Sequence, residues 1–429
     1  MTRWKNWAGN QQASPARVVA PRSVDEVVAV VNASAAAGVP VKAVGSGHSF
    51  TAAAVTTGTH VRPEGMTRVR SIDETTGLVT VEHGMPLHEL SEVLDQHGLA
   101  LTNMGDINVQ TVMGAISTST HGTGRDSAGL SAFVRGLEIV LADGSVVTCG
   151  PGDDLFEAAR VSVGSLGIVT AVTLQTEPSF LLQAREEPMR WEQVLDSFDA
   201  FCADNEHWEF YWFPHSEGCQ VKRNNRSAGP PAPLSDVRRW WDDEFLSNSL
   251  FGAVSRLGRA APRLVPSINK VSARALSARE YVTRSYDVFA TPRRVRFYEM
   301  EYAVPRSAAV ALLRELKALI EASHWLISFP LEVRVAPADD VWLSTSHGRD
   351  TVYIACHVFE RTDKDPYFRE VEALMTGYLG RPHWGKLHTR TAEDLAPLYP
   401  RWSDWQAVRD RVDPDRVFAN DYTRQVFGD

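Results

Sequence analysis

Cysteine is scarce in this chain of 429 residues, which contains only four. Cys149, Cys202, Cys219 and Cys356 lie far apart, and no two of them form a Cys-x-x-Cys pair. This spacing argues against a disulfide framework and against a structural zinc site, and it is typical of reduced, buried thiols. We therefore expect a cytoplasmic protein.

Long apolar runs and an excess of positive charge are also missing. No uninterrupted apolar stretch reaches the roughly 18–20 residues that a membrane-spanning helix needs. The start, MTRWKNWAGNQQ, has no apolar run that resembles a signal peptide. The formal net charge is −9 and the basic residues are scattered, which argues against nucleic acid as the main partner. We expect no membrane span, and the oligomeric state stays open.

What is present is the composition of a globular protein, with 44% hydrophobic and 23% charged residues. The length favours two domains. Most tryptophans and most of the long helical stretches lie beyond Pro178, so the first boundary is placed there. The expected division is a first domain over 1–178, a second over 179–400, and a C-terminal segment 401–429 that returns to the first domain.

Helices and strands alternate with clear end signals in the first part. Ser23, with Glu26 three places on, forms a capping box for a helix that ends near Gly38. The remaining expected elements are a strand at 39–44, a strand at 78–82, a helix opened by Pro86 and ended by Gly98, a β-hairpin at 136–149 and a strand at 168–175.

The second part mixes helices and strands in another order, which predicts an α+β fold class overall. Periodicity predicts helices at 191–205 and 307–323, and strands at 207–213, 298–304, 331–335 and 351–359. The three prolines of 227–235 indicate an exposed loop.

The most informative stretch is the turn Gly45-Ser46-Gly47-His48-Ser49 that follows the strand at 39–44. Glycines let backbone N–H groups approach a ligand, and turned N–H groups form an anion cradle. The turn lacks the third glycine of a dinucleotide fingerprint and the Gly-Lys-Ser/Thr of a P-loop. A tight surface turn is the alternative interpretation.

A second stretch of the same kind follows in two pieces, Asn103–Asp106 and Gly114–Gly124. Its hydroxyls and exposed N–H groups suit phosphate and ring oxygens. We interpret the two stretches as loops that grip the diphosphate and the ring of one large cofactor.

Three motifs in order carry a family resemblance: 41–50 (VKAVGSGHSF), the second glycine-rich stretch, and His383-Trp384-Gly385-Lys386. Together they resemble the sugar-1,4-lactone oxidase and alditol oxidase branch of the vanillyl-alcohol-oxidase family, whose FAD-binding domain is of the PCMH type. The likeness spans about residue 10 to 429. It implies a two-domain fold with an FAD-binding domain and an α+β substrate domain.

The resemblance also implies a cofactor site. His48 matches the histidine that relatives bond covalently to the flavin 8α-methyl carbon, which needs a neutral imidazole as nucleophile. The alternative is a loop histidine beside noncovalent FAD, as in relatives with another residue there. The implied FAD-contacting residues are Val44, Gly45, Ser46, Gly47, His48, Ser49, Phe50, Gly105, Asp106, Thr111, Gly114, Thr118, Ser119, Thr120, His121, Ile168 and Lys386.

Two positions in the second loop bear on specificity. Asp106 stands where alditol oxidases carry a serine near the substrate. This difference argues against the hypothesis that the substrate is an open-chain polyol. Gly105 stands near the place where dehydrogenase relatives carry a bulkier residue that obstructs oxygen. Its glycine favours an oxidase.

Glu332 and Arg334 can be placed from spacing alone. Leu331–Val335 alternates, so these two side chains share one strand face while the apolar residues share the other. An exposed ion pair on a half-buried strand is the simpler interpretation. The family resemblance favours a site instead, because Glu-x-Arg is where the family holds substrate hydroxyls. It also implies Lys386 as the third catalytic residue.

Other polar residues are also candidates. Glu299 and His357 are possible substrate contacts, although a core histidine is the more ordinary interpretation of His357. His383, His388 and His347 are not accompanied by clustered carboxylates or cysteines, so we expect no metal.

The resemblance implies oxidation of a sugar-1,4-lactone such as L-gulono-, L-galactono- or D-arabinono-1,4-lactone. Hydride would pass from C2 to flavin N5, the hydroxyl proton would go to Glu332 or Lys386, and the 2-keto product would tautomerise to an enediol. Oxygen, with hydrogen peroxide formed, or a redox acceptor would reoxidise the flavin. The rivals are an alditol oxidase acting on xylitol or sorbitol, a lactone dehydrogenase, and a noncatalytic or NAD-binding α/β protein.

Overall fold

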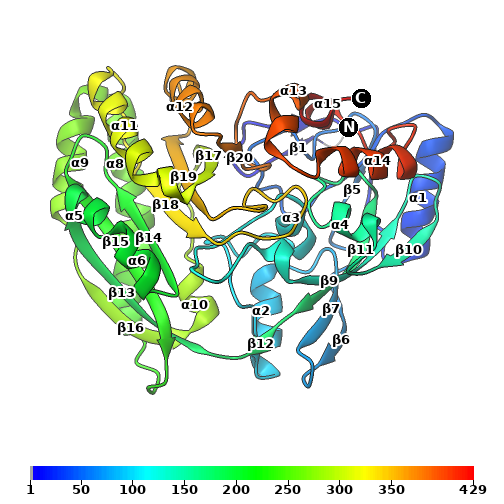
Figure 1. The fold of residues 1–429 in the computed structure, drawn as a ribbon, viewed down its shortest axis with the longest axis horizontal. Coiled ribbons are helices and arrows are strands. Elements are labelled where there is room, and N and C mark those ends of the chain that lie inside the picture. Colours follow the sequence, from blue (N-terminus) through cyan, green and yellow to red (C-terminus); the bar gives the residue numbers. More distant parts are fainter. Residues whose placement is uncertain (1–2) are drawn as a thin grey trace.

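The structure of the protein is a computed structural model, which describes residues 3–429. Its first half contains a five-stranded antiparallel sheet in the order β10-β9-β11-β7-β6 and a three-stranded parallel sheet in the order β3-β5-β4 (Figure 1). The strands are β3 (Arg17–Val19), β4 (Val41–Ala43), β5 (Thr59–Val61), β6 (Val69–Asp73), β7 (Leu78–Glu82), β9 (Val134–Val140), β10 (Val146–Cys149) and β11 (Ile168–Gln175). Short pairs are formed by β1 (Trp4–Lys5) with β2 (Gln12–Ala13) and by β8 (Leu99–Ala100) with β12 (Glu177–Pro178).

Helices α1 (Val24–Ala36), α2 (Leu87–Gln96), α3 (Val112–Ser117) and α4 (Asp154–Ala159) pack with these sheets. The side chain of Ser23 accepts a hydrogen bond from the N–H of Glu26 and so caps α1, as expected. The carboxylate of Glu26 accepts from the N–H of Arg22 rather than from that of Ser23, so the reciprocal half of the capping box is displaced by one residue.

The second half is built on an eight-stranded antiparallel sheet in the order β16-β13-β15-β14-β18-β19-β17-β20. Its strands are β13 (Leu181–Arg190), β14 (His207–Trp212), β15 (Gly218–Ser227), β16 (Arg279–Arg284), β17 (Phe297–Pro305), β18 (Leu331–Ala336), β19 (Thr351–Phe359) and β20 (Arg381–Pro382). One face is apolar and packs beneath α5 (Trp191–Asp196), α6 (Phe198–Asp204), α11 (Ala309–Ala322) and α12 (Asp365–Gly377). The opposite face is polar and meets the first half of the chain.

The last residues pack against the first half rather than the second. Helices α14 (Trp402–Val412) and α15 (Asp421–Phe427), which follow the short α13 (Ala392–Leu395), share a hydrophobic core with the helices α2, α3 and α4. The amide of Asn420 donates to the carbonyls of Ala52, Ala53 and Val55. Lys42 on β4 donates to the carbonyl of Phe418 at 3.1 Å. The chain end therefore lies against the segments on both sides of the first glycine-rich turn.

Most of the expected elements are confirmed, and two corrections are needed. The helix expected at 191–205 is broken at Ser197, whose ψ of 2° separates α5 from α6. A helical rod made of α7 (Asp236–Arg239), η2 (Trp240–Leu250) and α8 (Phe251–Ala260), followed by α9 (Val265–Arg274), was not anticipated. α10 (Ser285–Phe289) is a short further helix. Over residues 3–429, no helix is both long enough and apolar enough to cross a bilayer.

Candidate active site

The polar face of the large sheet carries a row of charged side chains in register. Tyr211 lies opposite Glu332 where β14 pairs with β18, and Glu209 lies opposite Arg334. On the other side of β19, Glu299 lies opposite His357. Residues at alternate positions share a face, so the Glu-x-Arg spacing brings its two side chains together as expected.

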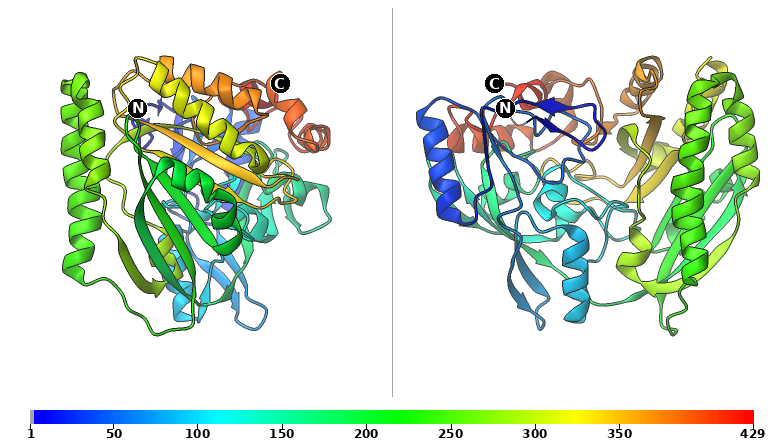
Figure 2. Two further views of the ribbon diagram at one scale, coloured as in Figure 1. Left: turned by 60° about the vertical axis from the view of Figure 1, so that its left-hand side comes forward. Right: turned by 180° about the vertical axis from the view of Figure 1, so that it is seen from behind.

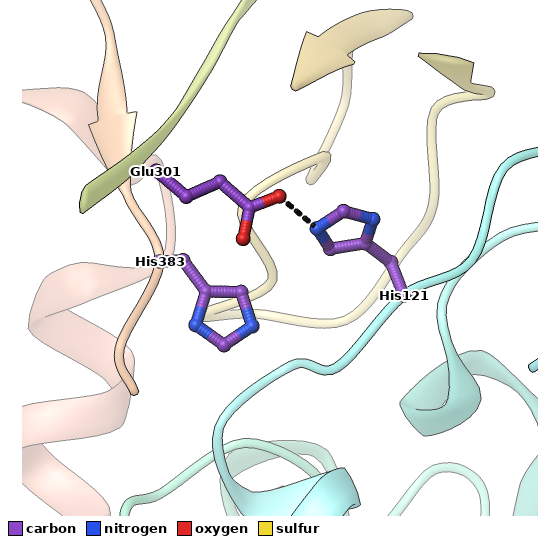
Figure 3. Close-up of side chains that lie close together, drawn as sticks. All are labelled: His121, Glu301 and His383. Atoms are coloured by element: carbon purple, nitrogen blue, oxygen red, sulfur yellow. Dashed lines mark ion pairs between the residues drawn. The ribbon is translucent and has the colours of Figure 1, made fainter. Parts of the chain in front are cut away.

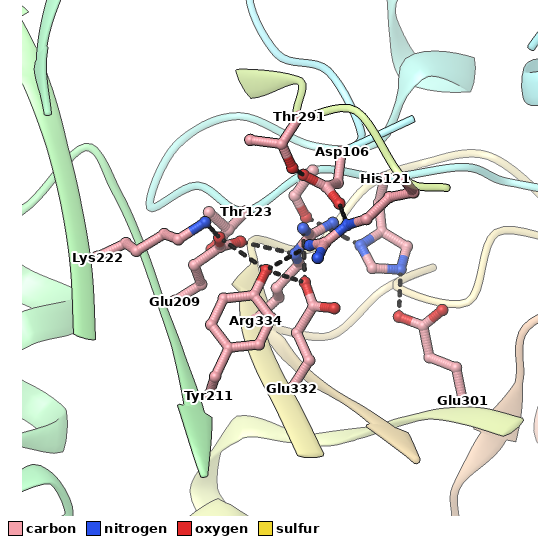
Figure 4. A network of polar contacts seen from close by, with 12 residues as sticks. Asp106, His121, Thr123, Glu209, Tyr211, Lys222, Thr291, Glu301, Glu332 and Arg334 are labelled. Carbon is pink, nitrogen blue, oxygen red and sulfur yellow. Dashed lines mark hydrogen bonds and ion pairs between the residues drawn. The ribbon is translucent and has the colours of Figure 1, made fainter. Parts of the chain in front are cut away.

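Arg334 is at the centre of a buried ion-pair network (Figure 4). Its Nε donates to Glu209 at 2.8 Å, and its Nη2 lies 2.5 Å from Glu332 Oε1. The hydroxyl of Tyr211 donates to Glu332 at 3.0 Å. Burial raises the pKa of Glu332, and the nearby Glu209 and Asp106 raise it further against the opposing effect of Arg334.

Asp106 reaches this network from the first half of the chain. Its carboxylate accepts from Thr291 Oγ1 and from Arg293 Nε, both at 2.6 Å, and its carbonyl accepts from the N–H of Thr291. Burial would raise the pKa of Asp106, but Arg293 and Arg334 outweigh burial and hold it well below its usual range. Asp106 is therefore an ionised anchor between the halves. Arg293 and Tyr211 are wall residues that the sequence did not reveal.

Lys386 lies between two carboxylates of β17. Its Nζ contacts Glu299 and lies 3.8 Å from Glu301 Oε2. Burial would lower the pKa of Lys386, but Glu299 and Glu301 outweigh it and raise the pKa. His357 Nε2 lies 3.5 Å from Glu299, which more than offsets burial and raises the pKa of His357. The ammonium of Lys386 therefore remains charged at neutral pH.

Glu301 also joins the two halves of the chain (Figure 3). Its Oε1 lies 2.9 Å from His121 Nε2, and His383 completes a buried group whose potential ligand atoms lie within 4.8 Å of one another. Two histidines and a carboxylate can bind a transition metal. Here the carboxylate already has Lys386 as a cationic neighbour, and His383 Nδ1 accepts from the N–H of Gly385 at 3.0 Å. Hydrogen bonds and the ammonium therefore account for the cluster without a metal.

Two cavities adjoin each other, one between the halves and one within the first half. The first, called the sheet cavity, is lined by the charged sheet residues Glu299, Glu301, Glu332, Arg334 and His357 together with Trp7, Phe50, Gly105, Asp106, Ile107, Thr120, His121, Tyr211, Phe251, Arg293, Phe297, Phe329, Pro330, His383, Gly385 and Lys386. The second, called the loop cavity, is lined by Val44–Gly47, Thr111, Gly114 and Ile168 among others. His48, Ser49, Gln110 and Thr118 line both. The two spaces therefore meet at the first glycine-rich turn.

The loop cavity has the features of a diphosphate and ring cradle. A Cβ on Gly45 would lie 2.4 Å from Thr111 Oγ1, and one on Gly114 would lie 2.7 Å from the same atom. Thr111 caps α3 by accepting from the N–H of Gly114. The two loops approach so closely because both positions lack a side chain, which leaves backbone N–H groups bordering the cavity. These residues fit FAD.

The residues expected to contact FAD fall into two sets, one lining each cavity. Val44, Gly45, Ser46, Gly47, Thr111, Gly114 and Ile168 line the loop cavity, whereas Phe50, Gly105, Asp106, Thr120, His121 and Lys386 line the sheet cavity. Ser119 lines neither; it has a positive φ of 60°, is buried, and donates to Ser344 Oγ at 3.4 Å. Its placement is structural.

His48 lies where the cavities join. Its ring stacks on that of Trp7, with centroids 5.2 Å apart. Burial, assisted by the charge of Lys386, lowers the pKa of His48 to about 4. The imidazole is therefore neutral at physiological pH, the form that can act as a nucleophile.

His83 is a residue of the loop cavity that sequence reasoning missed. It follows β7, its pKa is lowered to about 4 by burial, and its Nε2 is buried without a hydrogen-bond partner among residues 3–429. A buried unpaired nitrogen is costly unless a ligand pairs with it. We therefore expect His83 to hydrogen-bond FAD.

Replacing His83 by Leu is expected to weaken FAD binding about tenfold, because one hydrogen bond to the cofactor is lost. The dissociation constant can be measured by flavin fluorescence quenching in a His48→Ala background. His60 is the matched control, because its ring nitrogens are also buried without a hydrogen-bond partner in the described part of the chain, but it does not line the loop cavity. Equal effects of His60→Leu and His83→Leu would contradict the assignment.

The interlocked halves, the glycine cradle and the neutral histidine at the cavity junction define an FAD-binding flavoprotein. Residues 15–150 match the FAD binding domain family. Residues 172–426 match the D-arabinono-1,4-lactone oxidase family, and the chain belongs to this family. The expected resemblance to sugar-lactone and alditol oxidases is thereby confirmed.

Similar curated proteins share nearly the full length of the chain. An L-gulono-1,4-lactone dehydrogenase of Mycobacterium tuberculosis is 43% identical over 99% of both chains. An L-gulonolactone oxidase of Mus musculus is 34% identical, over 99% of this chain and 98% of that protein. An alditol oxidase of a Streptomyces species is 30% identical over 98% of each.

Among solved structures, a cholesterol oxidase from B. sterolicum superposes with a TM-score of 0.86 at 17% identity, over 99% of this chain and 96% of that one. A solvent-stable cholesterol oxidase gives a TM-score of 0.84 at 19% identity. At this identity the likeness shows the fold alone. The expected two-domain vanillyl-alcohol-oxidase-like fold is confirmed.

Proposed function

We propose that the protein is an FAD-dependent oxidoreductase that oxidises a neutral sugar-1,4-lactone, such as L-gulono-, L-galactono- or D-arabinono-1,4-lactone, to its 2-keto or enediol product. The observation that carries the proposal is the Glu332–Arg334 pair, which lines the same cavity as Lys386 and as His48 at the flavin end. The names of the relatives support this substrate class.

The charge balance of the sheet cavity supports a neutral substrate. Arg293 is paired with Asp106, Arg334 with Glu209 and Glu332, and Lys386 with Glu299. A carboxylate substrate would need a cation that is not already neutralised. Hydroxyl groups can instead donate to the carboxylates and accept from the cations, so a lactone suits this wall better than the open-chain acid anion.

Bound FAD supplies the hydride acceptor for the carbon that carries the hydroxyl. Glu332 lines the sheet cavity and takes the hydroxyl proton on a carboxylate oxygen. Its raised pKa makes it a stronger base than an exposed glutamate. Arg334, donating to Glu332 and Glu209, holds that carboxylate in place. Lys386 acts as a fixed cation that stabilises developing negative charge and orients the hydroxyl. Its raised pKa favours this role over that of a base.

We further propose that His48 holds the flavin covalently through the 8α-methyl carbon. The neutral imidazole at the cavity junction and its fixed position against Trp7 support this. The buried, free cysteines support a reducing compartment such as the cytoplasm.

Gly105 bears on the electron acceptor, since the names of the relatives include both an oxidase and a dehydrogenase. A Cβ at Gly105 would lie 3.1 Å from Thr120 Cγ2 and 3.2 Å from the carbonyl of His121. A methyl group at this position would therefore reduce the free space in the sheet cavity. We propose that oxygen reoxidises the flavin, with a redox protein as the alternative acceptor.

Gly105→Ala is expected to slow reoxidation of the reduced flavin by oxygen about tenfold, or about 1.4 kcal/mol in the barrier. The rate of flavin reduction by lactone should change little. Stopped-flow mixing of reduced enzyme with aerated buffer measures the first rate, and anaerobic mixing with lactone measures the second. A wild type that reacts with oxygen as slowly as the variant would favour a dehydrogenase.

The second candidate is an alditol oxidase, which one relative is named. The Asp106–Arg293 pair argues against it, because it fills with an ion pair the place where alditol oxidases carry a serine. Anaerobic flavin reduction by gulono-, galactono- and arabinono-1,4-lactones, compared with xylitol and sorbitol, tests the proposal. Faster reduction by the polyols would overturn it.

A further inference from the structure

A helical hairpin projects from the outer edge of the second half. Its first arm is the continuous rod of α7, η2 and α8, and its second arm is α9, joined by the short turn η3 (Pro262–Leu264). Figure 2 shows the rod standing at the periphery of the molecule, away from the FAD-binding half. α9 packs on β15.

The charge of this hairpin is opposite to that of the rest of the chain. Residues 251–277 contain five basic residues and no aspartate or glutamate, whereas the whole chain has a net charge of −9. The five are Arg256, Arg259, Arg263, Lys270 and Arg274, and all are exposed. Across residues 3–429, no carboxylate lies within ion-pair distance of any of them, although most of the chain's other basic residues are paired. The acidic residues of α7 and η2 are each paired with an arginine. The part of the hairpin formed by α8, η3 and α9 is therefore a local, unneutralised positive surface.

Large apolar side chains are exposed along the same hairpin. Leu250, Leu257, Leu264 and Val271 follow one another at intervals of seven and are 43%, 49%, 46% and 64% exposed. Trp240 and Trp241 near the start of the rod are 57% and 47% exposed. Isolated exposed leucines are ordinary, but a series interleaved with unpaired cations on one projecting element is not.

We propose that this hairpin adsorbs the protein to the surface of an anionic phospholipid bilayer. A bilayer interface accepts both features at once, because its headgroups neutralise the cations while its acyl boundary takes up leucine and tryptophan side chains. A convex ridge enters such a fluid surface readily, whereas a protein partner needs a complementary patch of roughly 800 Å². Adsorption of this kind needs no membrane-spanning helix.

The hairpin also borders the sheet cavity. Phe251, at the start of α8, lines that cavity and packs edge-on against Phe329 at 4.7 Å between ring centroids. Its outer surface can therefore meet lipid while its inner surface stays in the wall of the cavity.

Co-sedimentation of the flavin-loaded enzyme with vesicles tests the proposal. At low ionic strength the enzyme should sediment with phosphatidylcholine vesicles that contain phosphatidylglycerol, and not with pure phosphatidylcholine, and high salt should release it. Replacing Arg256, Arg263 and Lys270 together by Glu should lower the partition coefficient about a hundredfold. Leu257→Ser with Leu264→Ser should lower it about tenfold.

The matched control replaces Arg17, Arg369 and Arg411 by Glu, since these are also exposed and unpaired within residues 3–429 but lie outside the hairpin. It changes the net charge equally and should retain vesicle binding. The proposal fails if the wild type does not bind anionic vesicles, if it binds neutral vesicles equally, or if the control variant loses as much binding as the hairpin variant. It also fails if light scattering shows a dimer that the hairpin substitutions dissociate and no vesicle binding occurs.

Discussion

Glu332→Gln is expected to slow anaerobic flavin reduction by lactone about a thousandfold, within the range that general base catalysis contributes. The amide keeps the size and one hydrogen bond of the carboxylate but cannot take the hydroxyl proton. FAD content should be unchanged, because Glu332 lines the sheet cavity and not the loop cavity. Stopped-flow absorbance gives the rate, and the visible spectrum gives the flavin content.

The pH dependence gives a second readout. A base must be deprotonated to act, so wild-type flavin reduction should rise as the pH increases through the pKa of Glu332, which burial places above that of an ordinary glutamate. This limb should disappear in Glu332→Gln. Glu209→Gln is the matched control, because Glu209 is the other carboxylate paired with Arg334 but does not line the sheet cavity. Equal losses in the two variants would mean that Glu332 only balances the charge of Arg334.

His48→Ala is expected to abolish covalent attachment of the flavin, from nearly all of the cofactor in the wild type to none. After acid precipitation, yellow colour should stay with the wild-type chain and pass to the supernatant in the variant. Noncovalent FAD should still fill the loop cavity, since the glycine cradle of Gly45 and Gly114 is intact.

His97→Ala serves as control for loss of a histidine, because His97 is exposed and pairs with Glu74 far from both cavities. Mass spectrometry of tryptic peptides should find the flavin mass on the peptide that contains His48. Colour still fixed to the chain in His48→Ala would place the attachment elsewhere, and a wild type that releases all its flavin would show that the cofactor is held noncovalently.

Local signals in the sequence predicted most of the fold. Caps and alternation act over a few residues, so α1 after Ser23, α2 after Pro86 and the strand with Glu332 and Arg334 were expected and are confirmed. Spacing also predicted that Glu332 and Arg334 would share a face. The role of the pair came from the family resemblance, since alternation alone equally fits an exposed ion pair.

The rest depends on contacts between distant segments. Arg293 and Tyr211 carry no motif, and their place in the cavity follows from sheet register and from docking on Asp106. The periodicity of apolar residues continues across Ser197, so it does not reveal that the helix is interrupted there. The run of cations without acids in 251–277 was visible in the sequence, but a count over the whole chain concealed it.

The position of the chain end affects how the protein matures. Val41 donates to the carbonyl of Val417 at 2.8 Å, and Lys42 donates to that of Phe418, so the strand that leads into the first glycine turn is bonded to residues that are synthesised much later. N-terminal domains usually fold while the ribosome is still translating. Here the strand before the first glycine turn gains these partners only after residues 417 and 418 have been synthesised, so we expect the FAD-binding half to complete its fold after the second half has emerged.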